Sequence, residues 1–152
     1  TQKEISMNQT EYKSCSKWAN PIALLARVLL AAMFILAGVA KLGGLSGTIA
    51  FIASVGLPMP GLLAGLTIVL EIVGGIALII GYRTRLFASL LAGFTLLAAF
   101  IFHAFWAVPA DQAYVQNLLF MKNLSIAGGL LLLTALGGGA WILDNKLCQT
   151  KS

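Results

Sequence analysis

Residues 61–82, GLLAGLTIVLEIVGGIALIIGY, form a long apolar run. Glu71, close to the midpoint, is its only residue among Asp, Glu, Lys and Arg. About 20 mostly apolar residues form a helix long enough to cross a hydrocarbon core of about 30 Å. A barrel strand is about half as long and alternates in polarity. Because lipid offers the backbone no hydrogen-bonding partner, this stretch predicts a transmembrane helix.

Three more apolar runs occupy residues 22–42, 86–108 and 118–143, the last interrupted by glycines 137–139. The chain is 59% hydrophobic and only 10% charged, whereas soluble domains are roughly 45–50% apolar and about 25% charged. The first run is longer than the roughly 7–15 apolar residues of a signal peptide, so we expect it to be retained. The prediction is an all-α membrane protein, a bundle of four transmembrane helices.

The connections between the runs differ in character. Residues 83–85 form a tight turn, which makes the second and third spans an antiparallel hairpin. The longer link, residues 43–60, contains GTIAFIASVGLPMP and predicts a short external interfacial helix between helices 1 and 2, closed by Gly56. Its apolar stripe comprises Ile49, Phe51, Ile52 and Val55. Residues 109–117 are expected to form a short polar loop.

The basic residues predict the orientation. Seven of them fall on the side that holds both termini: Lys3, Lys13, Lys17, Arg83, Arg85, Lys146 and Lys151. The excess of Lys and Arg in cytoplasmic loops therefore predicts cytoplasmic N- and C-termini. We expect a polar cytoplasmic segment at residues 1–17, poorly ordered, a membrane domain at 18–146 and a cytoplasmic tail at 147–152. The net charge of +5 is scattered, so no nucleic-acid partner is expected, and the lipid bilayer is the implied partner.

Glu71 is the strongest candidate for a functional residue. It lies about 15 Å from either end of its span, at 1.5 Å per residue, so its carboxylate does not reach the headgroups. Such a group must be protonated, paired with a cation or exposed to a wet cavity. A functional cavity and a purely structural tie between helices both satisfy this requirement.

Other polar residues cluster toward the predicted external ends of the spans. We expect them to form an outer polar layer above Glu71: Lys41, His103, Lys122 and Asn123. The alternative is that they are unrelated interface residues. Arg27 is a further candidate for ligand binding, although its position near the start of its span favours snorkelling to the headgroups.

The sequence offers little support for a metal site or for a reaction that uses paired thiols. His103 has no second His, Cys or carboxylate at ligand spacing, so no metal site is expected. Cys15 and Cys148 flank the spans without a CxxC pair, which excludes a dithiol mechanism. No catalytic residue is assigned, and catalysis itself stays open.

The chain resembles the DoxX family of small bacterial inner-membrane proteins, and looks most like its YphA-type members. The resemblance is carried, in chain order, by Arg27, GVAKL, GTIAFIASVGLPMP, Glu71, GYRTR, His103, KNLSIAGG and the closing Leu143-Asp144. It implies a four-helix fold in the bacterial inner membrane. Some relatives are subunits of thiosulfate:quinone oxidoreductases and others are linked to oxidative-stress complexes, but fold-level analogy alone does not transfer the thiosulfate reaction.

Two functional hypotheses follow. The first is a redox-linked membrane subunit whose polar intramembrane site binds a quinone or similar small molecule, with no covalently bound cofactor. The second is a non-catalytic membrane component that binds partner proteins or supports assembly of a complex or homo-oligomer. A lipid or solute carrier is a third, and would require oligomerisation to form a path. An enclosed polar pocket favours the first, and a Glu71 consumed by a cation without a cavity favours the second.

Overall fold

The computed structural model describes the backbone of residues 2–144 and the side chains of residues 18–144. It contains only helices within that range, in the order α1 (Gln2–Gly43), α2 (Leu45–Ser54), α3 (Pro60–Ile80), α4 (Thr84–Phe102), a short 3₁₀ helix η1 (Phe105–Ala107) and α5 (Ala110–Leu136). Four segments are long and apolar enough to cross a membrane: Trp18–Gly43, Pro60–Ile80, Thr84–Ala107 and Ala110–Leu136. The predicted all-α fold with four spans is confirmed. The predicted tail, residues 147–152, lies outside the described residues.

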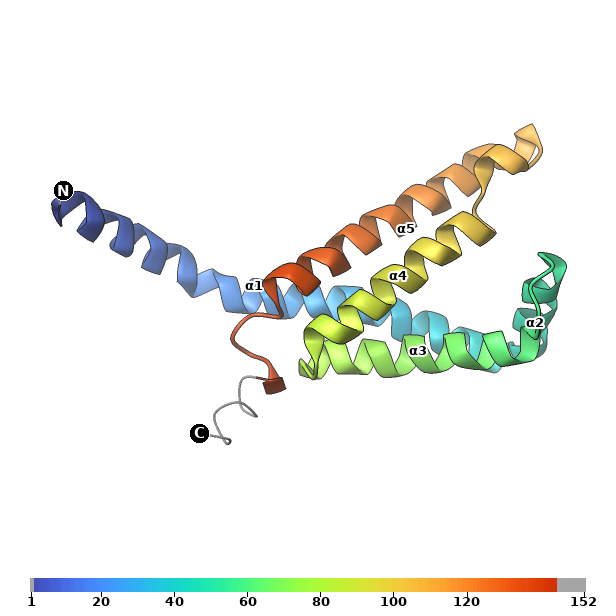
Figure 1. Cartoon of the computed structure of the whole chain (residues 1–152), viewed down its shortest axis with the longest axis horizontal. Helices are drawn as coiled ribbons and strands as arrows, with labels where there is room; N and C mark the ends of the chain where they lie inside the picture. Colours follow the sequence, from blue (N-terminus) through green and yellow to red (C-terminus); the bar gives the residue numbers. More distant parts are fainter. Residues whose placement is uncertain (1, 145–152) are drawn as a thin grey trace.

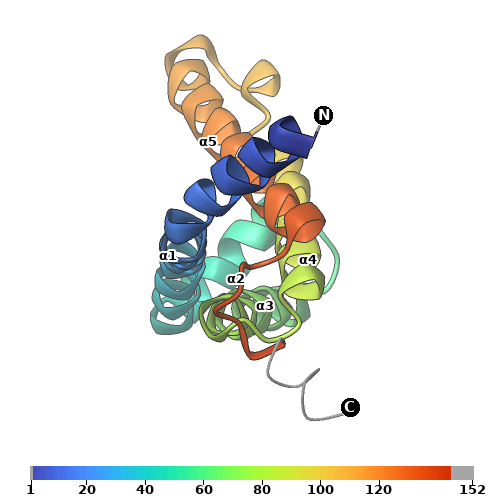
Figure 2. The ribbon, with the colours of Figure 1, turned by 90° about the vertical axis from the view of Figure 1, so that its left-hand side faces the viewer.

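The long helices form two antiparallel pairs, α1 with α3 and α4 with α5, and α3 also packs on α4. The pairs lie close together at one end and diverge toward the other (Figure 1). Helix α2 lies across that wider end, behind the long helices and between α1 and α4 in Figure 2. We call this the α2 end, and the opposite end, where the α3–α4 turn and the segment after α5 lie, the Arg27 end.

Small residues set how closely α1 and α3 approach. A Cβ added to Gly75 would lie 2.6 Å from Ile35 Cγ1, and one added to Gly38 would lie 2.7 Å from Ile72 Cγ1. Bare backbone at these crossings therefore permits the contact. Gly74 similarly faces Leu91 of α4, with 3.1 Å to the nearest atom.

Other glycines of the spans do not mark close crossings. Gly61, Gly65 and Gly128 have no neighbouring atom within 4 Å of an added Cβ, in contrast to Gly74 and Gly75. Gly129 is in ordinary contact with Leu30.

The fourth span begins eight residues earlier and ends seven residues earlier than predicted. Helix α5 begins at Ala110 and ends at Leu136, whereas the prediction was residues 118–143 with a polar loop at 109–117. The start was missed because this polar stretch continues the helix instead of forming a loop. The end follows from Gly137, whose φ of 84° lies in the region that favours glycine. The glycines 137–139, which were predicted to interrupt the fourth span, therefore follow the end of its helix.

The N-terminal segment also differs from expectation. Helix α1 begins at Gln2, so the backbone before Trp18 is helical and extends away from the bundle (Figure 1). Residues 2–17 continue the helix of the apolar span, which supplies the costly first turns. The predicted short helix before the second span is confirmed as α2, and Gly56 follows it with a φ of 77°.

Candidate functional site

Glu71 is buried and paired. It is 4% exposed, and both of its carboxylate oxygens accept hydrogen bonds from Lys41 Nζ at 2.8 Å. Lys41 stands near the end of α1, and the close crossing at Gly38 brings that helix against Glu71, whose Cβ would lie 3.3 Å from an added Gly38 Cβ. The close approach of α1 and α3 at Gly38 therefore brings Lys41 within hydrogen-bonding distance of Glu71.

A cavity of about 270 Å³ lies beside this ion pair at the α2 end. All five α-helices, α1 to α5, contribute residues to its lining. The cavity brings together Glu71 and the four residues predicted for the layer above it: Lys41, His103, Lys122 and Asn123. Three threonines, at positions 48, 67 and 95, add hydroxyl groups. The sequence pattern predicted that charged groups gather toward one end of the spans, but no pattern singled out these threonines.

Aromatic rings form much of the remaining wall. Phe34, Phe51, Phe94 and Phe102 all line the cavity. Phe51 of α2 stacks on Phe102 at the end of α4, with ring centroids 5.2 Å apart and planes inclined by 26°. This contact joins α2 to α4 across the space between the diverging helix pairs. Flat apolar walls with a few polar groups are typical of small-molecule sites.

His103 ends α4 and contacts the opposite helix of the hairpin. Its Nδ1 lies 2.9 Å from Gln116 Oε1. Lys122 follows Gln116 by six residues, which is about 9 Å along the helix. The sequence predicted that His103 and Lys122 share one depth; this is wrong because α5 starts earlier than expected and shifts the hairpin register. Lys122 thus reaches the cavity from a deeper level.

Two lining residues have unused hydrogen-bonding capacity. Asn123 is 9% exposed, and its carboxamide has no hydrogen bond with any residue that the structure describes. The ammonium of Lys122 likewise has no ion pair or hydrogen bond within the described range. Lys122 is exposed and Asn123 is buried beside it, so this side of the cavity offers polar groups that are not committed to a partner, unlike the pair of Lys41 and Glu71.

Arg27 is not part of this cavity. It is fully buried at the opposite end, where its guanidinium donates to the carbonyl oxygens of Leu78 at 3.0 Å, Ile79 at 3.2 Å and Trp141 at 2.7 Å. Snorkelling was the wrong interpretation. The carbonyls at the end of α3 lack helical partners and carry partial negative charge, so they hold the cation inside the bundle.

The segment after α5 completes the Arg27 end. Asp144 accepts hydrogen bonds from the backbone N–H groups of Arg83 at 2.7 Å and Thr84 at 3.0 Å, which satisfies donors at the start of α4. Asn20 Oδ1 accepts from the Ala140 N–H at 2.9 Å. Sequence reasoning missed Asp144 as a cap, although its chain position after the glycine run could have suggested a returning segment.

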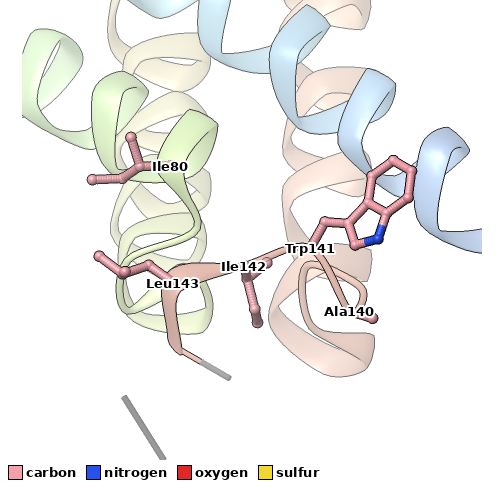
Figure 3. A pocket seen from close by; sticks show the side chains of 5 residues that line it. All are labelled: Ile80, Ala140, Trp141, Ile142 and Leu143. Atoms are coloured by element: carbon pink, nitrogen blue, oxygen red, sulfur yellow. The ribbon is translucent and has the colours of Figure 1, made fainter. Parts of the chain in front are cut away.

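A second cavity borders this segment without offering chemistry. It measures about 340 Å³ and is lined by Ile80, Ala140, Trp141, Ile142 and Leu143, which Figure 3 shows along the chain that crosses the end of α3. None of these side chains ionises. In the described part of the chain, no three His, Cys, Asp or Glu residues lie close enough to hold a metal ion.

Comparison with known proteins places the chain in a family. Residues 22–104 match the DoxX family. The inner membrane protein YqjF of Escherichia coli (strain K12) is 44% identical over 124 residues, which cover 82% of this chain and 90% of that protein. The inner membrane protein YphA of the same organism is 40% identical over 129 residues, covering 84% and 92%.

A more distant relative carries a functional name. The Bacillus subtilis (strain 168) protein named "Putative oxidoreductase CatD" is 33% identical over 104 residues, which cover 68% of this chain and 75% of that protein. No solved structure matches the chain significantly. The family match, the extent of the two inner-membrane relatives and the four apolar spans agree, and the chain belongs to the DoxX family of integral inner-membrane proteins.

Proposed function

We propose that this chain is a redox-linked membrane subunit that reversibly binds the head group of a quinone in the cavity at the α2 end. The observation that carries the proposal is the composition of that cavity, in which four phenylalanines and unpartnered polar groups line the same space of about 270 Å³. A quinone head is a flat apolar ring with carbonyl acceptors at its edges. It requires apolar walls and hydrogen-bond donors together.

The size of the cavity suits a head group. Pockets for drug-sized ligands measure about 300–1,000 Å³, so a cavity of about 270 Å³ takes a single ring system rather than a whole lipid. The apolar tail of a quinone would remain in the bilayer. Lys122 and Asn123 supply donors, and Phe94 and Phe102 supply ring faces.

The ion pair does not argue against a ligand. A Glu71 consumed by a cation without a cavity would have favoured a purely structural membrane component. Here Lys41 does neutralise Glu71, yet the cavity lies directly beside the pair. The relative named as an oxidoreductase supports the redox link, whereas the names of YqjF and YphA describe location only.

Filling the cavity tests the proposal. The protein in nanodiscs is titrated with decylubiquinone and menadione, and binding is followed by calorimetry. Ala98→Phe introduces a ring at a lining position, whereas Leu97→Phe introduces the same ring at a side chain that is 65% exposed. We expect saturable binding that Ala98→Phe weakens at least tenfold and Leu97→Phe leaves unchanged.

Two results would oppose the proposal. One is the absence of saturable quinone binding by the unmodified protein, which would favour a non-catalytic component of a membrane complex. The other is equal affinity of the two phenylalanine variants, provided that both elute as monodisperse species on size exclusion. Binding would then occur outside the cavity.

A further inference from the structure

The polar groups of the cavity fall into a satisfied set and an unsatisfied set. Lys41 and Glu71 neutralise each other at 2.8 Å, and His103 contacts Gln116. Thr95 donates its hydroxyl to the Leu91 carbonyl at 2.7 Å. These groups have partners whether or not a ligand is bound, so they shape the cavity without requiring an occupant.

The unsatisfied set is Lys122 and Asn123, neighbours on α5. Asn123 is nine-tenths buried and lines the cavity, and its amide has no hydrogen bond within the described residues. Lys122 lines the same cavity with an exposed side chain, and it too has no partner there. In a lipid environment an ammonium group favours an anionic partner or water. One negatively charged oxygen in the cavity would supply an acceptor to both groups.

The charge of the cavity points to the sign of that ligand. Its lining includes two cations, Lys41 and Lys122, one carboxylate, Glu71, and the imidazole of His103. Because Glu71 compensates Lys41, the charge of Lys122 is left over. The electrostatically matched occupant therefore carries one negative charge close to Lys122, on an oxygen that also accepts from Asn123.

We infer that Lys122 and Asn123 form an oxyanion-recognition pair, so that the cavity prefers a quinone-type head group whose ring carries an ionised oxygen over a neutral quinone of the same size. This inference rests on the proposed function and specifies its ligand class: a flat aromatic head with a phenolate-like oxygen. A charge-assisted hydrogen bond is roughly twice as strong as a neutral one, which sets the expected selectivity.

A matched pair of ligands tests the inference. The probes are 2-hydroxy-1,4-naphthoquinone, which is ionised at neutral pH, and 2-methoxy-1,4-naphthoquinone, which is neutral and of similar size. We expect the protein in zwitterionic nanodiscs to bind the hydroxy compound about ten- to a hundredfold more tightly. Lys122→Gln should remove this preference, so that the variant binds the two compounds with similar affinity.

Further variants distinguish the effect of the Lys122 charge on binding from an effect on folding. Lys122→Arg keeps the charge and should retain the preference, and Arg83→Gln removes an exposed cation from the other end of the bundle and should have no effect. Because Lys122 has no partner within the described residues, its replacement should not unfold the protein. Asn123→Leu should weaken binding of both compounds, since it removes a donor to either.

The outcomes distinguish this inference from the proposed function. Equal binding of the two compounds by the unmodified protein, or a preference that survives Lys122→Gln, would overturn the oxyanion pair and leave quinone binding intact. A lysine that merely extends to the headgroups would give that result. If neither compound binds, the proposed function fails and the oxyanion pair fails with it.

Discussion

Replacing Arg27 by methionine removes the central polar contact of the Arg27 end. The guanidinium is fully buried and donates to three carbonyl oxygens, two at the end of α3 and one in the segment after α5, at 2.7–3.2 Å. Methionine has a similar length and no donor. The substitution therefore leaves the carbonyls without this partner while largely preserving the volume of the side chain.

The size of the effect can be worked from these contacts. Hydrogen bonds to charged groups contribute about 1.5–3 kcal/mol each, so three of them set an upper range of roughly 4.5–9 kcal/mol. Burying the guanidinium costs several kcal/mol in the native protein, and methionine avoids that cost. As the net of these two terms, we expect Arg27→Met to lower the free energy of unfolding by about 3–5 kcal/mol.

Unfolding by SDS in mixed micelles, followed by circular dichroism and tryptophan fluorescence, measures this change. Arg83→Met is the matched control because Arg83 is exposed and its backbone N–H, which Asp144 accepts, is retained. Arg27→Lys should fall between the two, since one ammonium replaces a planar fork of donors. A loss of less than about 0.5 kcal/mol in Arg27→Met, the usual effect of a surface substitution, would show that these hydrogen bonds do not stabilise the bundle.

Three further predictions concern packing, pairing and orientation. Gly75→Ala should lower stability in the same SDS assay by about 1–3 kcal/mol through overpacking, because its Cβ would lie 2.6 Å from a side-chain carbon of α1. Gly65→Ala, which places its methyl group in open space, should not lower stability. Equal losses in the two variants would contradict the close crossing of α1 and α3 at Gly75. Lys41→Met and Glu71→Gln should each destabilise, and the double variant should lose less than their sum by about 1–3 kcal/mol; strict additivity would rule out coupling through the ion pair. A C-terminal reporter fusion should report cytoplasm, and a single cysteine introduced at Gln112 in a cysteine-free chain should react with an impermeant reagent from outside; a periplasmic C-terminus would overturn the charge-based orientation.

The spans could be predicted from sequence because crossing a bilayer is a local property. Length and apolar content suffice, and they located four helices that the structure confirms. The boundaries of α5 were beyond this reasoning. Its first two turns, from Ala110 to Asn117, are polar and helical, and a polar helix that extends past the apolar core has the composition of a loop.

The sequence predicted which charged residues lie at the site, but only part of their arrangement. Depth along each span brought Lys41, His103 and Lys122 to the same end. Which face each helix turns inward depends on close crossings such as that of Gly38 with Ile72, and a single sequence does not show which helices meet. The aromatic wall and the Phe51–Phe102 stack were missed for the same reason.

Arg27 was misinterpreted because its partners are backbone atoms. No acidic residue in the sequence stands opposite it, and depth alone favoured snorkelling. Its acceptors are the carbonyls of Leu78, Ile79 and Trp141, which become available only when α3 ends and the segment after α5 folds back. Sequence patterns show side-chain chemistry, whereas these acceptors arise from helix ends.

The two ends of the bundle use polar groups in opposite ways. We therefore predict that variants at one end change stability and variants at the other end change ligand affinity. At the Arg27 end, Arg27 and Asp144 satisfy backbone groups of helix ends, so removing either should lower stability without a change in ligand affinity beyond what unfolding explains. At the α2 end, Lys122 and Asn123 have no partners among the described residues, so removing them should change ligand affinity with little loss of stability. Measuring both properties on Asp144→Ala and Lys122→Gln decides the matter: if Lys122→Gln destabilises the ligand-free protein as much as Asp144→Ala, the α2 end is structural, and the division between ends is wrong.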